Sequence, residues 1–246
     1  MIIKNKRFIG IVVLTFLLLF MVIFSNSFQM ILNNIVGNKG STVSRTPMYI
    51  YFFQHLYMVI ISSLISVVIG VGVGLFVTTD KGKEYKEILL KLVNLGQAFP
   101  SPALLALMVP ILGYGSNGAL IALVIYALMP IIYNTVTGIE QVSKEVLEAG
   151  KGMGMNNYQL YKTIKIPLAM KVILGGIRTA IVINISAATL AAAVGAGGLG
   201  VLVVNGVRTF DMNLILQGAI PVTILAIIAD LTLKSLEVKY MYNQDA

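Results

Sequence analysis

Charge, cysteine, tryptophan and histidine are scarce or missing in this chain of 246 residues. Charged residues make up only 11% of the chain, whereas soluble globular domains contain about 25%. Hydrophobic residues account for 57%, and the mean hydropathy is +0.88. This balance excludes an ordinary soluble enzyme and a disordered chain, and it indicates an all-α integral membrane protein. The absence of cysteine also excludes disulfides, zinc–thiolate sites and cysteine nucleophiles.

Six apolar stretches are long enough to cross a bilayer, which needs about 20 residues. They are Phe8–Phe24, Leu56–Val77, Leu92–Leu112, Gly118–Thr137, Val172–Gly195 and Leu214–Leu233. The first could instead be a signal peptide, but its 17 residues exceed the usual apolar region of about 7–15. We therefore expect about six transmembrane helices, with the first one retained.

The basic residues predict the orientation of these spans. Fourteen of the 18 Lys and Arg residues lie before the first span, between the second and third, between the fourth and fifth, or after the sixth. On the opposite side lie Lys39, Arg45 and Arg208. Because cytoplasmic loops of membrane proteins are enriched in Lys and Arg, both termini are expected in the cytoplasm.

The groups that membrane enzymes need are missing. The single histidine, His55, is expected at the outer membrane interface, and one histidine cannot form an HExxH zinc site. An intramembrane aspartyl protease needs two aspartates, whereas the spans contain only Asp230. The sequence has no GxxxxGK[ST] motif, so the chain does not hydrolyse ATP by a P-loop mechanism. We expect a transport subunit without catalytic residues or a metal site.

Only two charged residues, Arg178 and Asp230, fall within the predicted spans. Asp230 precedes Lys234 by four residues, the favoured spacing for an ion pair on one helix face. Such a pair is the preferred interpretation, and a proton or substrate site is the alternative. Arg178 is interpreted as an interfacial anchor, with a substrate contact as the alternative. This scarcity of buried charge, without a clear inverted repeat, disfavours an ion-coupled carrier or channel.

Polar and small residues in the spans suggest weaker sites. Asn184, Ser186 and Thr189 are candidates for a substrate path, although bonding to neighbouring helices is favoured. A GxGxxG pattern comprises Gly195, Gly197, Gly198 and Gly200, but no strand precedes it, so it predicts a gate or closely packed backbone. Gly70 and Gly74 form a GxxxG pattern, which predicts close helix packing within or between subunits.

The cytoplasmic loop 138–171 has the pattern of a helix–turn–helix. Ser143 can cap a first helix, Gly152 and Gly154 permit a break, and Asn156 can cap a second helix that Pro167 ends. Apolar residues at helical spacing follow each cap: Val146, Leu147, Gly150 and Met153, then Tyr158, Leu160, Tyr161 and Ile164. This pattern favours a docking element for a cytoplasmic protein, and a pair of helices on the membrane surface is the alternative.

This loop resembles a known motif. Glu148-Ala149-Gly150, followed by Gly154 and then by Ile164-Lys165-Ile166-Pro167, is similar to the EAA motif of the membrane subunits of bacterial ABC importers. Gly150 and Ile166 depart from its usual Ala and Leu. The resemblance implies a coupling helix that docks on an ABC ATPase. The implied docking residues are Glu148, Ala149, Gly150, Gly154, Ile164, Ile166 and Pro167.

Three further stretches, 97–107, 195–200 and 218–221, resemble the osmoprotectant branch of these permeases, which imports glycine betaine, choline, carnitine or proline. A methionine-type amino-acid permease is the alternative. The resemblance implies a type I importer (MetI-like) bundle in the plasma membrane. It also implies a second permease subunit, the same or paralogous, and an extracytoplasmic substrate-binding protein. ATP and Mg would be bound by the ATPase.

The expected organisation has three parts. Residues 1–54 form an N-terminal transmembrane helix and an outer loop, Ser25–Gln54. Residues 55–240 form the permease domain with its coupling loop, and residues 241–246 form a cytoplasmic tail.

Overall fold

The computed structural model describes residues 2–37 and 46–242, and in these ranges all regular structure is helical. The helices are α1 (Ile2–Ile23), α2 (Ser25–Val36), α3 (Met48–Val77), α4 (Lys83–Ala98), α5 (Ser101–Leu112), α6 (Ser116–Glu140), α7 (Lys144–Gly152), α8 (Asn157–Gln159), η1 (Leu160–Lys165), α9 (Ile166–Leu190), η2 (Ala191–Val194), α10 (Gly200–Thr209) and α11 (Met212–Tyr242). The predicted all-α class is therefore confirmed for the described residues.

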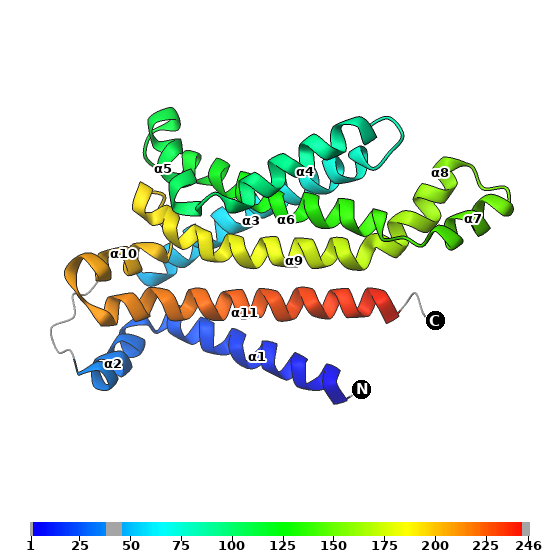
Figure 1. Ribbon diagram of the computed structural model, residues 1–246. Coiled ribbons are helices and arrows are strands. Elements are labelled where there is room, and N and C mark those ends of the chain that lie inside the picture. The colour runs from blue at the N-terminus through cyan, green and yellow to red at the C-terminus, as the bar shows by residue number, and fades with distance from the viewer. Residues whose placement is uncertain (1, 38–45, 243–246) are drawn as a thin grey trace.

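The long helices lie side by side in a bundle (Figure 1). Helix α6 packs against both α3 and α9, while α11 packs against α9 and α1. By length and composition, four segments could each cross a membrane: Met48–Val77, Ser116–Glu140, Asn157–Val194 and Met212–Val238. Two bent helix pairs, α1 with α2 and α4 with α5, bring the total to six if each pair counts as one span.

The third predicted span, Leu92–Leu112, is broken at Pro100. Helices α4 and α5 meet there at 99°. Phe99 is extended, as expected for a residue before proline, because the proline ring disfavours the helical conformation there. The apolar stretch that we assigned to one span therefore consists of the second half of α4 and all of α5.

The segment expected as the outer loop, Ser25–Gln54, is largely helical in its described residues. Ser25–Val36 is a helix bent 97° away from the preceding one, and α3 already begins at Met48. Phe28 and Leu32, one turn apart, are buried and hold α2 against the bundle. The length of apolar runs does not predict this helix, because apolar and polar residues are mixed along α2 and its exposed face carries both.

The GxxxG pair allows α3 and α6 to approach closely. A Cβ atom at Gly70 would lie 2.8 Å from Ile131, and one at Gly74 would lie 2.6 Å from Thr135. Such distances are shorter than van der Waals contact, so only glycine fits there without a shift. The predicted close packing is confirmed, and its partner is α6 of the same chain.

Candidate functional site

The loop between α6 and α9 forms the predicted helix–turn–helix and projects beyond the bundle (Figure 1). The Ser143 hydroxyl oxygen accepts a hydrogen bond from the Val146 N–H at 3.4 Å and caps α7. After α7, Gly154 adopts a φ of +82°, which favours glycine. Asn156 and Gln159 then form a reciprocal capping box, with both bonds at 2.9 Å. Both predicted caps and the predicted break are therefore confirmed.

The prediction that Pro167 ends the second helix is wrong. The chain is helical without a break from Asn157 to Val194, through the π-helical turn η1. The Ile166 N–H donates to the Tyr161 carbonyl five residues earlier. This wider turn lies directly before Pro167, so the proline ring is accommodated at the start of α9. The loop is consequently joined rigidly to α9.

The outward face of the loop carries part of the EAA-like motif. Glu148, Ala149 and Gly154 are all exposed, as are the apolar side chains of Val146 and Met153. Apolar side chains exposed to water at a tip of the molecule mark a surface that another surface can cover.

The remaining motif residues face inward and organise the loop. Gly150 is buried, and a Cβ atom there would lie 2.6 Å from Leu160 and 2.8 Å from Ile164. Ile166 packs on a buried cluster that includes Ile139. The inward residues hold α7 against η1 and so fix the direction in which Glu148 projects.

Hydrogen bonds also attach the loop to the end of α3. The Tyr161 hydroxyl donates to the Leu75 carbonyl at 2.7 Å and lies 2.6 Å from the Thr78 hydroxyl. The Asn157 amide donates to Asp80 at 3.3 Å. An open pocket of about 630 Å³ lies between these elements and α7. Sequence reasoning did not find this attachment, because the partners are far apart in the chain.

One carboxylate of the loop has an altered proton affinity. The Ser143 hydroxyl donates to the Glu145 carboxylate, and this hydrogen bond lowers the pKa of Glu145. The first turn of α7 therefore keeps its negative charge to a lower pH, and a negative charge at this end of a helix interacts favourably with the helix dipole. Among the described residues, no three His, Asp or Glu side chains gather closely enough to hold a metal ion.

The structure separates the three candidate path residues. Asn184 is fully buried, and its amide donates to the hydroxyls of Ser62 at 2.7 Å and Ser63 at 3.0 Å. Ser186 is exposed and turns its hydroxyl to the backbone of its own helix. Thr189 is partly buried. Asn184 thus joins α9 to α3, while Ser186 faces outward from α9.

The glycine-rich segment 195–200 packs closely against α3 and the end of α9. Gly198 has a φ of +80°, and its N–H donates to the Gln54 side-chain oxygen at 3.0 Å. A Cβ atom at Gly200 would lie only 1.9 Å from the Thr189 carbonyl oxygen. Gly195 and Gly197 also have positive φ. The backbone path through this segment therefore depends on glycine.

The expected interfacial position of His55 is wrong. The side chain is fully buried in α3, and its Nε2–H donates to the Ile185 carbonyl at 3.1 Å. The partner is 130 residues away, so no local pattern could have predicted it. Histidine acts here as a link between α3 and α9.

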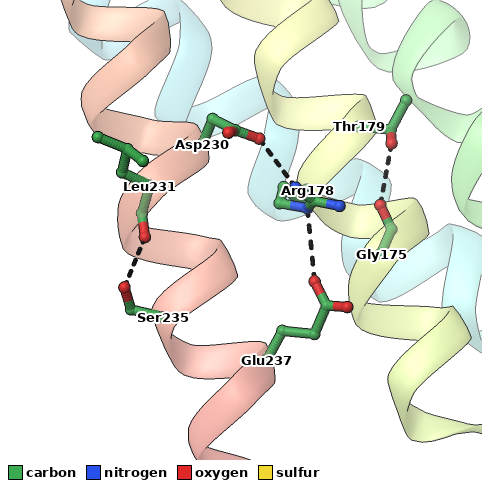
Figure 2. A network of polar contacts seen from close by, with 7 residues as sticks. All are labelled: Gly175, Arg178, Thr179, Asp230, Leu231, Ser235 and Glu237. Carbon is green, nitrogen blue, oxygen red and sulfur yellow. Dashed lines mark hydrogen bonds and ion pairs between the residues drawn. The ribbon is translucent and has the colours of Figure 1, made fainter. Parts of the chain in front are cut away.

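Arg178 and Asp230 meet between α9 and α11 (Figure 2). Arg178 Nη1 lies 3.1 Å from Asp230 Oδ1, and Arg178 Nε lies 3.5 Å from Glu237 Oε2. The preferred prediction of an Asp230–Lys234 pair is wrong, because no ion pair of Lys234 occurs among the described residues. The guanidinium of the neighbouring helix is the partner instead.

Comparison with known proteins identifies the class. Residues 66–240 match the family of binding-protein-dependent transport system inner membrane components, and the chain belongs to this family. It is a multi-pass inner-membrane transport subunit, and the family works with ATPase and substrate-binding partners. The permease that the EAA-like loop predicted is confirmed.

Particular relatives are similar over most of their length. The carnitine transport permease protein OpuCB of Listeria monocytogenes is 42% identical over 75% of this chain and 84% of the relative. The glycine betaine/carnitine/choline permease OpuCB of Bacillus subtilis is 40% identical over 76% and 85%. The osmoprotectant import permease OsmW of Salmonella typhimurium is 38% identical over 82% and 93%.

Solved structures support the fold. An inward-facing form of the MetNI methionine ABC transporter matches with a TM-score of 0.70 at 21% identity, over 80% of this chain and 99% of that chain. An amino acid ABC transporter crystallised with histidines matches with a TM-score of 0.62 at 18% identity, over 82% and 100%. The predicted methionine-permease-like bundle is therefore confirmed as a fold.

Proposed function

We propose that this permease subunit imports a small osmoprotectant, of the class of glycine betaine, choline, carnitine or proline, and is driven through the loop 138–171. The observation that carries the substrate class is the 38–42% identity to relatives named for osmoprotectants. The methionine-transporter likeness supports the fold only, because it rests on 21% identity.

The docking surface for the ATPase is the outward face of α7 and the turn after it. Glu148, Ala149 and Gly154 would contact the ATPase, because they are exposed at the projecting tip. Gly150, Ile164, Ile166 and Pro167 would hold the loop in place for that contact. Gly150 is buried and the other three are partly buried, which supports this division of roles. A carboxylate, small residues and exposed apolar side chains together suit a groove on a folded partner.

The projecting end of the bundle would face the cytoplasm. The first turn of α1 and the last turns of α11 lie toward this same end (Figure 1). The turn between α3 and α4, which contains Lys81 and leads into α4 at Lys83, lies there too, whereas α10, the helix that contains Arg208, lies at the opposite end (Figure 1). This distribution supports the positive-inside orientation. A second permease subunit and an outer binding protein would complete the importer.

Recognition of the substrate would rest mainly with the binding protein. The chain has no tryptophan with which to build an aromatic cage for a quaternary ammonium group. Ser186 and Thr189 would offer weak transit contacts, whereas Asn184 would mainly hold α9 to α3. The segment with Gly195 and Gly198 would act as closely packed backbone beside the path, or as its gate.

Purification of the tagged chain from its native membrane tests this proposal. We expect an ABC ATPase to co-purify. Glu148→Lys should weaken that association and lower ATP-driven uptake, because it reverses the charge at the docking tip. Glu84→Lys, at an exposed glutamate of α4, is the matched control and should behave like the wild type.

The substrate class is tested in proteoliposomes that contain the complete importer. Excess unlabelled glycine betaine, choline, carnitine or proline should compete with labelled glycine betaine, whereas methionine should not. Competition by methionine alone would contradict the substrate class. Unchanged uptake with Glu148→Lys would contradict the docking assignment.

A further inference from the structure

A small charged cluster joins α9 to α11 (Figure 2). One guanidinium, that of Arg178, faces the carboxylates of Asp230 and Glu237 at 3.1 and 3.5 Å. The three side chains are 26%, 42% and 15% exposed, respectively. The cluster is therefore only partly accessible, and it carries one more carboxylate than guanidinium.

Such a cluster stays in place only while its partners stay together. Removing one partner of a partly buried ion pair leaves a charge without its partner, which is unfavourable in an apolar bundle. The planar guanidinium also restricts the relative position of the helices, because it contacts each carboxylate through a different nitrogen. Arg178 thus fixes the register between α9 and α11.

The location of Arg178 connects this register to the loop. The helix that contains it runs without a break from Asn157, in the loop itself, to Val194. A displacement of the loop is therefore transmitted along one helix to Arg178. The carboxylates lie on a different helix, α11, so a shift of α9 relative to α11 changes their distance to the guanidinium.

Helix α11 carries a second cation for the same carboxylates. Lys234 follows Asp230 by four residues and precedes Glu237 by three, so the three side chains share one helix face. No ion pair or hydrogen bond of Lys234 occurs among the described residues. A lysine within reach of both carboxylates by helical spacing, but unused in this state, can take the place of Arg178 as their cationic partner when Arg178 moves away.

We propose that Arg178 and Lys234 are alternating partners of Asp230 and Glu237 during the transport cycle. In the Arg178-paired state, α11 moves with the helix of the loop. In the Lys234-paired state, the two helices separate without leaving a carboxylate unpaired. The four residues are positioning residues, and the proposal rests on the proposed function because ATPase motion drives the exchange.

Spin labels on α9 and α11 can report the exchange directly, since the native chain has no cysteine. Thr179→Cys and Leu236→Cys place labels at exposed sites beside the cluster. The complete importer, with its ATPase, is reconstituted in lipid nanodiscs. Distances are measured by double electron–electron resonance without nucleotide and after trapping with ATP and vanadate. Complexes labelled at only one of the two positions show which distances arise between subunits, so that these can be separated from the distance within one chain.

We expect two distances whose proportions change with nucleotide. Lys234→Met should reduce the population of the separated state at least about fivefold, because Asp230 and Glu237 would lose their replacement partner in that state. Arg178→Met should instead reduce the population of the state in which Arg178 is the partner of the two carboxylates. Lys91→Met is the matched control and should leave both distances unchanged, because the ion pair of Lys91 among the described residues is the exposed one with Glu87.

A neutral variant separates positioning from folding. Combining Arg178→Met with Asp230→Asn and Glu237→Gln removes all three charges of the cluster. No charge is then left without its partner, so the variant should regain the stability that Arg178→Met alone loses if the cluster is purely structural. We expect this variant to assemble and hydrolyse ATP, but with uptake per ATP about tenfold lower, because α11 no longer follows α9. Full uptake per ATP in this variant would overturn the proposal.

Three further outcomes are decisive. Provided that the ATPase is bound, a single distance that does not change with nucleotide in the wild type would overturn the exchange. Equal distance distributions for Lys234→Met and Lys91→Met would overturn it as well. Failure of any ATPase to assemble with the wild type would overturn the proposed function, and with it the exchange that rests on it.

Discussion

The junction between α9 and α10 should be intolerant of even one added methyl group. Gly200 begins α10 where the chain passes the last turn of α9. A Cβ atom there would lie 1.9 Å from the carbonyl oxygen of Thr189, 2.7 Å from its carbonyl carbon and 2.9 Å from its Cα. All three atoms belong to the backbone, so no side-chain rotation relieves the overlap. Gly200→Ala must therefore displace one helix end from the other.

The geometry gives the size of the effect. Close carbon–oxygen contacts occur at about 3.3 Å, so the 1.9 Å approach requires a separation of roughly 1.4 Å. Closely packed interiors accommodate such overpacking at about 1–3 kcal/mol. At about 2–4 °C per kcal/mol for chains of this size, a cost near 2 kcal/mol lowers the unfolding midpoint by about 4–8 °C.

The assay is the fraction of detergent-solubilised protein that stays monodisperse after heating, measured by size-exclusion chromatography. Gly175→Ala in α9 is the matched control, because a Cβ atom there has no neighbour within 4 Å. It should leave the midpoint unchanged or raise it, since alanine favours a helix by about 0.8–1 kcal/mol over glycine. Equal midpoints for the two variants would refute the packing argument. A normal midpoint with slow uptake would instead favour a gate at this segment.

Three further substitutions test local features. Asn184→Ala should lower the unfolding midpoint, because two interhelical hydrogen bonds worth about 0.6 kcal/mol each are lost, and a changed substrate preference at unaltered stability would contradict its packing role. Asn156→Ala removes the capping box, worth about 0.5–2 kcal/mol, and should speed tryptic cleavage after the exposed Lys151. Ser143→Ala should raise the pKa of Glu145 toward its ordinary value, measured by NMR with labelled glutamate. The Ser143 bond stabilises the fold above the ordinary pKa and is lost as the pH falls through the lowered pKa, so an unchanged titration would contradict it.

Features encoded by neighbouring residues were predictable from the sequence. Long apolar helices follow from length and hydropathy, because an unpaired backbone cannot persist in lipid. The bend at Pro100 follows from the restricted residue before proline. The caps at Ser143 and Asn156 need only the next three residues. The EAA-like spacing also lies within 20 residues, so the family could be identified from it.

Features that depend on the arrangement of helices were not predictable. Asp230 had a suitable partner four residues away, Lys234, yet pairs with Arg178, which is 52 residues away in sequence. His55 was assigned by its place near the end of an apolar run, whereas its burial depends on α9. Even the loop motif divides into exposed and buried residues only after η1 folds against α7, as the burial of Gly150 shows.

Polar side chains in the bundle differ in where their hydrogen-bond partners lie. Hydroxyls such as those of Thr135 and Thr223 bond to the carbonyl four residues earlier in their own helix, so they do not need a neighbouring helix. Other side chains have their partners on a neighbouring helix, as the Ser66 hydroxyl does when it donates to the Val124 carbonyl of α6 at 3.0 Å.

Three larger polar groups also link helices. His55 and Asn184 join α3 to α9, and Arg178 joins α9 to α11. Helix α9, which continues into the loop, takes part in all of these links. If the loop drives transport, a displacement of α9 must either carry its neighbours along or break these few bonds. Substitutions at these residues should therefore impair coupling more than substitutions of the hydroxyls that bond within their own helix.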